Sequence, residues 1–421
     1  MENGAGNTAG AAAAYSEGYS TQASGESAHA EGSTTIASGS AAHAEGHLTQ
    51  ATNDTAHAEG TSTTASGEAS HAEGYLTHAT GNSTHAEGAL TLAAGAEAHA
   101  EGNSTQALGD HSHAEGHSTT ASGTAAHAEG ANTVAGGSFA HAEGVSSVSS
   151  GAYAHAEGAN TTADGQASHA EGFMTQAFGA NSHAEGENTM VMPDHTGAHI
   201  MGQNGSTRFA YSWHLANGLT VGPSLNSAVI EGATGNLYLD GTVISPAAAD
   251  YAEMFETADG IALEPGYFVT FDGAGDKIRK ATSGDSYILG VVSARPAILA
   301  DSSDLRWHKL FVTDEWDRIL YQEVEVPEVR DPAGNVLRTA TTKIEPVLNP
   351  DWNASQAYIP RIEREEWVAV GILGKLLVRD DGTCQPGSYC MPNNDGIATA
   401  APAGYRVLNR TRDDQIRIFV R

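Results

Sequence analysis

The tetrapeptide His-Ala-Glu-Gly at residues 29–32 decides the fold, because it recurs in register through much of the chain. Twelve identical copies begin at His29 and end with the copy at His183, and each starts 14 residues after the last. A degenerate copy, Tyr-Ser-Glu-Gly, occupies residues 15–18. A 14-residue unit is too short for a helix pair or a propeller blade, so each copy is predicted to be one rung of a β-solenoid.

Each repeat has two similar halves of seven residues, and each half reads as a short strand followed by a turn that contains Gly. The second Gly column, which includes Gly25 and Gly39, is interrupted only by Asn53 and Pro193. Asn tolerates positive φ better than other residues with a side chain, so Asn53 predicts a left-handed turn in this column. Pro193 predicts the end of the roll.

Strand alternation assigns the faces of each rung. The predicted interior columns hold almost nothing larger than Thr, and they are those of Thr35, Ala37, Ala42 and Ala44. The columns of His43 and Glu45 point outward. Such a thin core buries little apolar area, so at ~25 cal/mol per Å² one chain alone would be marginally stable. Association of several chains is therefore predicted.

The outward His and Glu columns leave two questions open. A structural His–Glu network is favoured over a ladder of metal sites, so no metal is predicted. The strict repetition of this face, against free variation at Gln22, Ile36 and Leu92, favours a subunit interface. The alternative is that apolar residues of the variable column pack on the axis of the oligomer, which leaves His and Glu in solvent.

Repeats of this Ala-x-Gly-x-x-Ser/Thr type resemble the left-handed parallel β-roll of trimeric autotransporter adhesin (YadA-like) heads. The resemblance covers residues 15–192 and implies a left-handed roll of about thirteen rungs in a homotrimer. Residues 1–14 read as a flexible or poorly formed first rung. Residues 193–249, where aromatic residues concentrate, read as a neck or tip, either a packed trimeric junction or a contact for a host-surface receptor. Short β-branched runs in residues 250–421 predict a mostly antiparallel β domain, so the whole chain is expected to be all-β.

Composition limits the partners. The 421 residues carry a formal charge of −31, and Arg208 is the only basic residue before residue 250. Nucleic acid and anionic membranes are therefore poor partners. No apolar run approaches ~20 residues, so no membrane insertion is expected. The N-terminus lacks the features of a secretion signal, which places folding in the cytoplasm. Cys384 and Cys390 are expected to be free thiols.

The composition changes at Ser-Pro-Ala-Ala-Ala-Asp-Tyr-Ala-Glu-Met-Phe-Glu, residues 245–256. A stretch of small residues runs directly into closely spaced carboxylates, an arrangement typical of a cleavage site with its own acid and base. On spacing alone, the start of a solvated charged strand is the favoured interpretation. The motifs that follow in the sequence favour the cleavage site instead. They include Pro265-Gly266-Tyr267-Phe268, Tyr287-Ile288-Leu289-Gly290, Val370-Gly371-Ile372-Leu373-Gly374 and Gly404-Tyr405-Arg406.

Together these motifs resemble the glutamic-type, self-cleaving intramolecular chaperone domain at the C-terminus of phage neck-appendage and tailspike proteins. The resemblance covers residues 250–421. It implies a domain that drives trimer assembly of the β-structure before it and then cuts itself off, as a single-turnover endopeptidase without a cofactor. The scissile bond would be Ala249–Asp250, with Asp250 and Glu253 as the catalytic carboxylates.

The resulting hypothesis is a trimeric phage or prophage tail fibre or appendage protein. It would assemble in the host cytoplasm and then reside in the virion, with baseplate or neck proteins and a host-surface receptor as partners. The alternative is a host-encoded surface adhesin or spore-layer filament built from the same modules. A depolymerase tailspike would need an acidic cleft in a wide β-helix, and this roll is too thin to provide one.

The distribution of basic residues predicts an asymmetric response to trypsin. Arg208 is the only tryptic site in residues 1–249, whereas residues 250–421 contain 19 basic residues. Trypsin should leave the repeats whole while it degrades the C-terminal domain, as followed by gel electrophoresis and fragment masses. Residues 1–207 contain no tryptic site, so their survival follows from composition whatever their fold. Survival of residues 250–421 at a dose of trypsin that cuts at Arg208 would contradict the expected asymmetry.

Overall fold

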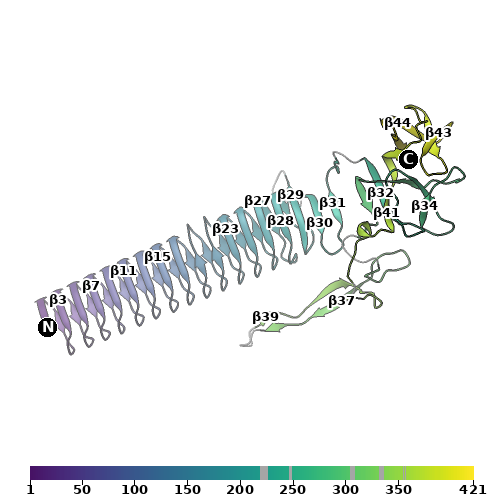
Figure 1. The fold of residues 1–421 in the computed structure, drawn as a ribbon. Helices are drawn as coiled ribbons and strands as arrows, with labels where there is room; N and C mark the ends of the chain where they lie inside the picture. Colours follow the sequence, from purple (N-terminus) through teal and green to yellow (C-terminus); the bar gives the residue numbers. More distant parts are fainter. Residues whose placement is uncertain (219–225, 246–248, 304–308, 331–335, 354, 356) are drawn as a thin grey trace. The chain divides into compact units, whose positions relative to one another are not determined.

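The computed structural model describes the whole chain except residues 219–225, 246–248, 304–308, 331–335, 354 and 356 (Figure 1). It divides into two compact units, Met1–Thr242 and Val243–Arg421. Among the described residues, no helix has the length and apolar character needed to span a membrane.

The first unit is a parallel β-solenoid of about 15 turns (Figure 1), which confirms the predicted architecture. Successive repeats stack in register, so that His29 pairs with His43 and Ile36 with Gln50. The longer strand column comprises β1 (Glu2–Ala5), β3 (Tyr15–Tyr19), β5 (His29–Ser33), β7 (His43–His47), β9 (His57–Thr61), β11 (His71–Tyr75), β13 (His85–Ala89), β15 (His99–Asn103), β17 (His113–His117), β19 (His127–Ala128), β21 (His141–Ala142), β23 (His155–Ala159), β25 (His169–Phe173) and β27 (His183–Val191). The shorter column comprises β2 (Thr8–Ala9), β4 (Gln22–Ala23), β6 (Ile36–Ala37), β8 (Gln50–Ala51), β10 (Thr64–Ala65), β12 (His78–Ala79), β14 (Leu92–Ala93), β16 (Gln106–Ala107), β18 (Thr120–Ala121), β20 (Val134–Ala135), β22 (Val148–Ser149), β24 (Thr162–Ala163) and β26 (Gln176–Ala177).

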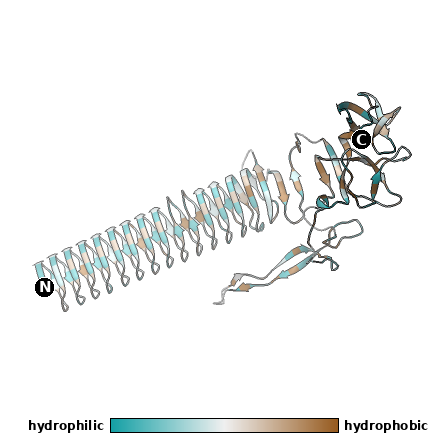
Figure 2. Ribbon diagram, viewed as in Figure 1, coloured by the Kyte–Doolittle hydropathy of each residue, from teal (hydrophilic) through white to brown (hydrophobic). Residues whose placement is uncertain are grey.

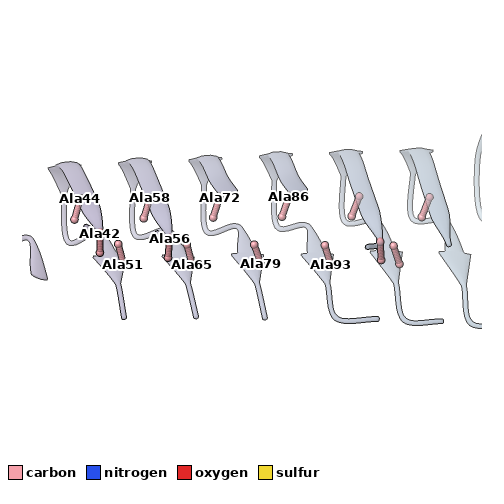
Figure 3. Close-up of a cluster of buried hydrophobic side chains, with 14 of the residues drawn as sticks. Ala42, Ala44, Ala51, Ala56, Ala58, Ala65, Ala72, Ala79, Ala86 and Ala93 are labelled. Atoms are coloured by element: carbon pink, nitrogen blue, oxygen red, sulfur yellow. The ribbon is translucent and has the colours of Figure 1, made fainter. Parts of the chain in front are cut away.

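The predicted interior is confirmed by burial. Thr35, Ala37, Ala42 and Ala44 are all at most 1% exposed. Figure 3 shows the Ala44 column and the Ala51 column facing each other across the rungs. Small Ala and Thr side chains fill this space, and Figure 2 shows few strongly hydrophobic residues along the solenoid. The core is therefore continuous but thin, and each rung contributes little apolar area.

Residues 1–14 correct an expectation, because they form a regular rung. β1 pairs with β3 in register, with Glu2 opposite Ser16, and β2 pairs with β4. The predicted end at Pro193 is also wrong. Pro193 and Asp194 add two residues to a turn, so His183 pairs with His199, which lies 16 residues later. Because the insertion lies in a turn, the parallel ladder continues unbroken.

The solenoid ends with a change of strand direction. β28 (His199–Ser206) and β29 (Ser212–Asn217) extend the parallel stack. β30 (Asn226–Glu231) then pairs antiparallel with β29, and β31 (Leu237–Leu239) pairs antiparallel with β30. The last four strands of this unit thus convert a solenoid into a small sheet.

Gly recurs in the column of Gly25 and Gly39 for a reason other than the positive φ that Asn53 predicted. Neither Asn53 nor Gly39 has a positive φ, whereas Gly32 has φ 105° and Thr34 has φ 60°. A Cβ added to Gly39 would lie 1.9 Å from the carbonyl oxygen of Asn53 in the next rung. Space between stacked backbones, and not backbone conformation, therefore selects Gly in this column.

The outward histidines stack along the solenoid. The ring centroids of His29 and His43 are 4.8 Å apart with an interplanar angle of 1°. Carboxylates line the same face, as where the Oε1 atom of Glu73 lies 3.4 Å from Nε2 of His85. Identical ionisable groups are therefore held at the spacing of the rungs.

Both columns have shifted proton affinities. Burial lowers the pKa of His43, His71, His99, His113, His141, His155, His169 and His199, and for most of them the charge of a neighbouring imidazolium lowers it further. Hydrogen bonds between carboxylates of adjacent rungs raise the pKa of Glu59, Glu87, Glu115 and Glu143 to about 7. The same bonds lower the pKa of the carboxylates between them, Glu45, Glu73, Glu101 and Glu129. The pKa of the glutamates therefore alternates along the column between raised and lowered values.

The second unit is built around a 10-stranded sheet that is mostly antiparallel, as predicted (Figure 1). Its strands are β32 (Asp250–Glu256), β33 (Phe268–Phe271), β34 (Ile278–Lys280), β35 (Gly290–Val292), β36 (Ile298–Ala300), β41 (Trp367–Arg379), β42 (Tyr389–Pro392), β43 (Ala398–Ala401), β44 (Tyr405–Arg412) and β45 (Gln415–Val420). The remaining elements are two antiparallel pairs, β37 (Tyr321–Val326) with β40 (Thr341–Pro346) and β38 (Val329–Arg330) with β39 (Val336–Arg338), and the short 3₁₀ helix η1 (Arg361–Glu363). Phe268, Val378, Ile416 and Ile418 form its fully buried core.

Two adjacent glycines provide a matched test of the stacking. A Cβ at Gly137 would lie 2.1 Å from the carbonyl oxygen of Gly151, whereas a Cβ at Gly136 would meet nothing closer than 3.9 Å. Gly137→Ala should lower the free energy of unfolding by about 1–3 kcal/mol, because the added methyl group overpacks the stack. Gly136→Ala should be neutral or stabilise by about 0.5 kcal/mol. Thermal unfolding followed by circular dichroism checks both, and equal effects would contradict the steric explanation.

The two ionisable columns predict a stability maximum near neutral pH. The lowered His pKa values mean that stability present above the ordinary value of 6.5 is lost as the pH falls toward the folded values. The Glu pKa values raised from 4.5 to about 7 mean that stability present below pH 4.5 is lost as the pH rises through about 7. The unfolding temperature of the solenoid should therefore be highest between about pH 6.5 and 7.

Variants separate the two effects. His99→Gln should weaken the decline on the acid side, and Glu87→Gln should weaken the decline on the alkaline side. Glu68→Gln, at an exposed turn, is the control and should change neither. An unfolding temperature that stays constant from about pH 5 to 9 would show that the columns do not contribute.

Candidate cleavage site

The strand β32 carries the predicted cleavage motif at its first residue. β32 pairs antiparallel with β41, with Asp250 opposite Gly374 and Glu253 opposite Val370. It also pairs with β36 in parallel, with Tyr251 opposite Ile298. The chain before Asp250 is rich in small residues, whereas β32 has the alternating pattern of a half-buried strand, so regular pairing begins at the predicted scissile bond.

The predicted scissile peptide is held by backbone contacts from both sides. The carbonyl oxygen of Ala249 accepts a hydrogen bond from the backbone N–H of Lys375 at 3.3 Å. The carbonyl oxygen of Asp250 accepts one from Ala297 at 2.8 Å. Ala249 is exposed and Asp250 is 6% exposed, so the peptide lies at the boundary between solvent and the core of this unit.

Asp250 points into the packed side of β32. Its burial matches that of Ala252 and Met254, which alternate with it along the strand. The Oδ2 atom is buried and has no hydrogen-bond partner among the described residues. A Cβ added to Gly371 would lie 3.0 Å from this oxygen, so a glycine provides the space for the carboxyl group.

Glu253 lies on the opposite face of β32. The hydroxyl of Tyr251 donates a hydrogen bond to Oε1 of Glu253 at 2.8 Å. This bond raises the pKa of Tyr251. Residues three apart in a strand face opposite sides, and the irregularity between Tyr251 and Ala252 leaves the alternation of burial intact. The structure therefore places the two predicted carboxylates on one strand but does not bring them together, and their catalytic roles stay predictions.

A cavity of about 440 Å³ opens beside the predicted scissile peptide. Its lining residues come from five segments that are distant in the sequence. They are Ala249, Asp250, Pro265, Gly266, Val292, Ser293, Ala294, Arg295, Lys375, Leu376, Leu377, Gln415 and Arg417. The sequence interpretation did not identify Arg295, Lys375 or Arg417, because nothing in their local sequence marks them.

The two cysteines lie in the core of the same unit. Cys384 and Cys390 are free and buried. Burial raises the pKa of the Cys390 thiol to about 12 and raises that of Cys384 as well. Thiolates, and not thiols, are the reactive form, so neither side chain is suited to nucleophilic catalysis near neutral pH.

Groups of residues whose composition would allow metal ligation occur along the solenoid. His29, Glu31 and His43 form one of several groups whose potential ligand atoms lie within 4.8 Å of one another. Zinc binds each ligand at about 2.0–2.2 Å, so two ligand atoms on one ion are at most about 4.4 Å apart. The stacked imidazoles would have to leave their 4.8 Å spacing to share an ion. The arrangement fits a stacked network better than a preformed metal site.

Comparison with known proteins identifies relatives in phages of Bacillus. The chain is 36% identical over 156 residues to the pre-neck appendage protein of Bacillus phage B103. The aligned region covers 37% of this chain and 16% of that protein. The chain is also 34% identical over 151 residues to the pre-neck appendage protein of Bacillus phage phi29. That aligned region covers 36% of this chain and 16% of that protein. The chain thus matches about a sixth of the length of these curated relatives.

A solved structure and a family model also match this chain. The crystal structure of the bacteriophage phi29 gene product 12 C-terminal fragment is 31% identical, covers 41% of this chain and 100% of that fragment, and has a TM-score of 0.33. The family model described as Peptidase_G2, IMC autoproteolytic cleavage domain, matches residues 203–415. That match spans half of the 421 residues, so this chain belongs to the Peptidase_G2, IMC autoproteolytic cleavage domain family.

Proposed function

We propose that this chain is the precursor of a homotrimeric phage or prophage tail fibre or neck appendage. Residues 250–421 guide folding of the trimer and then hydrolyse the Ala249–Asp250 bond once. The observation that carries the proposal is the buried Asp250 carboxyl group, which has no partner among the described residues and adjoins a peptide that opens onto a cavity. A buried polar atom without a partner destabilises a resting fold, so a functional role explains its retention.

The reaction needs a proton acceptor and a proton donor. Water adds to the carbonyl carbon of Ala249, the C–N bond breaks, and the nitrogen of Asp250 leaves as an amine. One carboxylate removes a proton from the attacking water, and a carboxylic acid donates a proton to the leaving nitrogen. Asp250 and Glu253 are the pair assigned to these two roles, which defines a glutamic-type mechanism without metal or cofactor.

The separation of the two carboxylates links cleavage to assembly. Within one chain, Asp250 and Glu253 lie on opposite faces of β32. A site with both groups therefore requires a Glu253 from a neighbouring chain, or a rearrangement of β32 on assembly. Either route delays the near-attack geometry until the trimer has formed. Loss of the chaperone domain then leaves a mature trimer whose persistence is kinetic.

The outer face of the solenoid supports association. The stacked histidines keep their Nε2 atoms buried beside carboxylates of the same chain, as where Nε2 of His43 lies 3.8 Å from Oε2 of Glu45, but about a third of each of these two side chains, 35% and 34%, stays exposed. A partner surface with the same axial repeat can pack against these exposed parts rung by rung, and a second copy of the chain has that repeat. Of the two alternatives left open by the sequence, this favours the His–Glu face as the subunit interface.

The His and Glu columns continue into an apolar surface at the end of the solenoid. Trp213 follows His199 in the stack, with ring centroids 4.6 Å apart, and Leu215 follows Met201. The strand register then places Ile230 beside Trp213 and Leu237 beside Ile230. Trp213, Leu215, Ile230, Leu237 and Leu239 are all exposed. A contiguous exposed apolar surface marks an interaction site, which fits burial against neighbouring chains.

The relatives set the biological context of the proposal. Relatives named as pre-neck appendage proteins support a final location in the virion. Assembly in the host cytoplasm and attachment to neck or baseplate proteins are further parts of the proposal. The net charge of −31 favours neither nucleic acid nor an anionic membrane as partner. The receptor contact expected within residues 193–249 would be part of the mature trimer.

Variants of the two carboxylates test the proposed mechanism. The wild-type protein should separate into residues 1–249 and 250–421, as measured by intact mass. Glu253→Ala should trimerise but cleave at least about 100-fold more slowly, because a proton donor or acceptor is lost while little packing changes. Asp276→Asn, on an exposed loop of the same unit, is the control and should cleave like the wild type.

Co-expression distinguishes a shared site from a site within one chain. Mixed trimers of Glu253→Ala and Asp250→Asn chains combine an intact Asp250 and an intact Glu253 on different chains. Cleavage of the Glu253→Ala chains in mixed trimers, but not in homotypic ones, would establish a site shared between chains. A Glu253→Ala homotrimer that still yields a fragment starting at Asp250 would refute the assigned chemistry. A wild-type trimer that never cleaves would refute the proposed function itself.

A further inference from the structure

The strand β41 changes its pairing partner beside the predicted scissile bond. Gly374 is the residue at which pairing with β32 ends and pairing with β45 begins. Its φ of 118° is a conformation that residues with a side chain rarely adopt. The backbone is therefore bent at the point where it meets Ala249 and Asp250.

Gly374 brings the β41 backbone into direct contact with the scissile peptide. A Cβ at this position would lie 2.2 Å from the carbonyl oxygen of Ala249, 3.1 Å from its carbonyl carbon and 2.9 Å from Cα of Asp250. Any side chain would push the two segments apart. The next residue, Lys375, directs its backbone N–H at the same carbonyl oxygen, 3.3 Å away.

We propose that the backbone N–H of Lys375 is the donor that stabilises the oxyanion during cleavage, and that Gly374 is its positioning residue. The inference rests on the proposed cleavage of the Ala249–Asp250 bond. When water adds to the carbonyl carbon, the π electron pair moves onto the carbonyl oxygen, and the negative charge develops where this N–H points. A preorganised donor at that position lowers the barrier because it needs no reorganisation.

The length of the contact favours the transition state over the resting state. At 3.3 Å the hydrogen bond lies beyond the usual range for N–H···O bonds. It can shorten as charge accumulates on the oxygen, so its contribution grows along the reaction. Catalysis requires this difference, since a donor that bound both states equally would not accelerate the step.

The adjoining cavity provides space for the attacking water and basic residues near the scissile peptide. It has a volume of about 440 Å³ next to Ala249, which leaves room for the attacking water. Arg295, Lys375 and Arg417 are among its lining residues, and three basic residues at one cavity favour a positive potential there. Asp250, whose backbone nitrogen is the leaving group, also contributes to the lining of this cavity.

The test measures the rate constant and the amplitude of self-cleavage separately. In a single-turnover reaction the amplitude reports the fraction of correctly assembled chains, whereas the rate constant reports the chemical step. Gly374→Ala should lower the rate constant about 100-fold or more, the loss expected for one oxyanion donor, while most chains still cleave in the end. The factor should be the same at every pH, because no titrating group is changed.

Gly382→Ala is the matched control. Gly382 also has a positive φ, 90°, but a Cβ there would meet nothing within 4 Å. It should cleave within a few-fold of the wild-type rate constant, which excludes a general effect of replacing a strained glycine. Sedimentation of both variants checks that they assemble.

The outcomes separate this inference from the proposed function. Cleavage of Gly374→Ala at the wild-type rate constant would overturn the role of the Lys375 amide and leave the proposed function intact. A reduced amplitude with an unchanged rate constant would assign Gly374 to folding alone and would also overturn the inference. Absence of cleavage in the wild type would refute the proposed function from which the inference starts.

Discussion

Direct stacking of one backbone on the next is the constraint on which the solenoid depends. A Cβ at Gly39 would lie 1.9 Å from the carbonyl oxygen of Asn53 in the following rung, and the same close approach recurs in rung after rung. Between the two strand columns the interior is mostly a row of Ala and Thr, with little apolar area per residue. Little stability per rung therefore comes from the core, so the length of the ladder matters, and the association with other chains proposed above would add to it.

The same regularity creates an electrostatic problem on the outer face. Identical repeats in register place like groups next to each other, so His stacks on His and Glu lies next to Glu. A row of fully ionised glutamates at this spacing would repel, and shared protons or facing imidazoles reduce that repulsion. At the end of the solenoid the face becomes apolar, with Trp213 and Leu215 in the places of His and Glu. One continuous surface thus passes from a charged ladder to a hydrophobic patch, which is the composition expected of a surface that buries against its own copies.

The predicted cleavage site depends on the same kind of backbone contact in a different setting. Gly374 removes the side chain that would separate β41 from the Ala249–Asp250 peptide, as Gly39 does between rungs. Here the close contact does not stack rungs. It positions the backbone N–H of Lys375 toward the carbonyl oxygen of Ala249. The two proposed carboxylates lie on opposite faces of β32, and this separation supplies a physical reason for a precursor that stays intact until it has assembled.

The sequence by itself determined the period, the interior columns and the class of the second domain, because each follows from local alternation and repetition. It also indicated the Ala249–Asp250 bond and the two carboxylates through a resemblance that the family match supports. It misread Asn53 because a Gly column selected for space looks the same in a sequence as one selected for positive φ. It misread Pro193 because two residues added to a turn break the period without breaking the ladder. Only the tertiary structure decided that one strand runs without interruption through Asp250 and Glu253, and local alternation then turns the two side chains to opposite faces. Only the tertiary structure decided that Lys375 meets Ala249, since this contact depends on how distant strands pair.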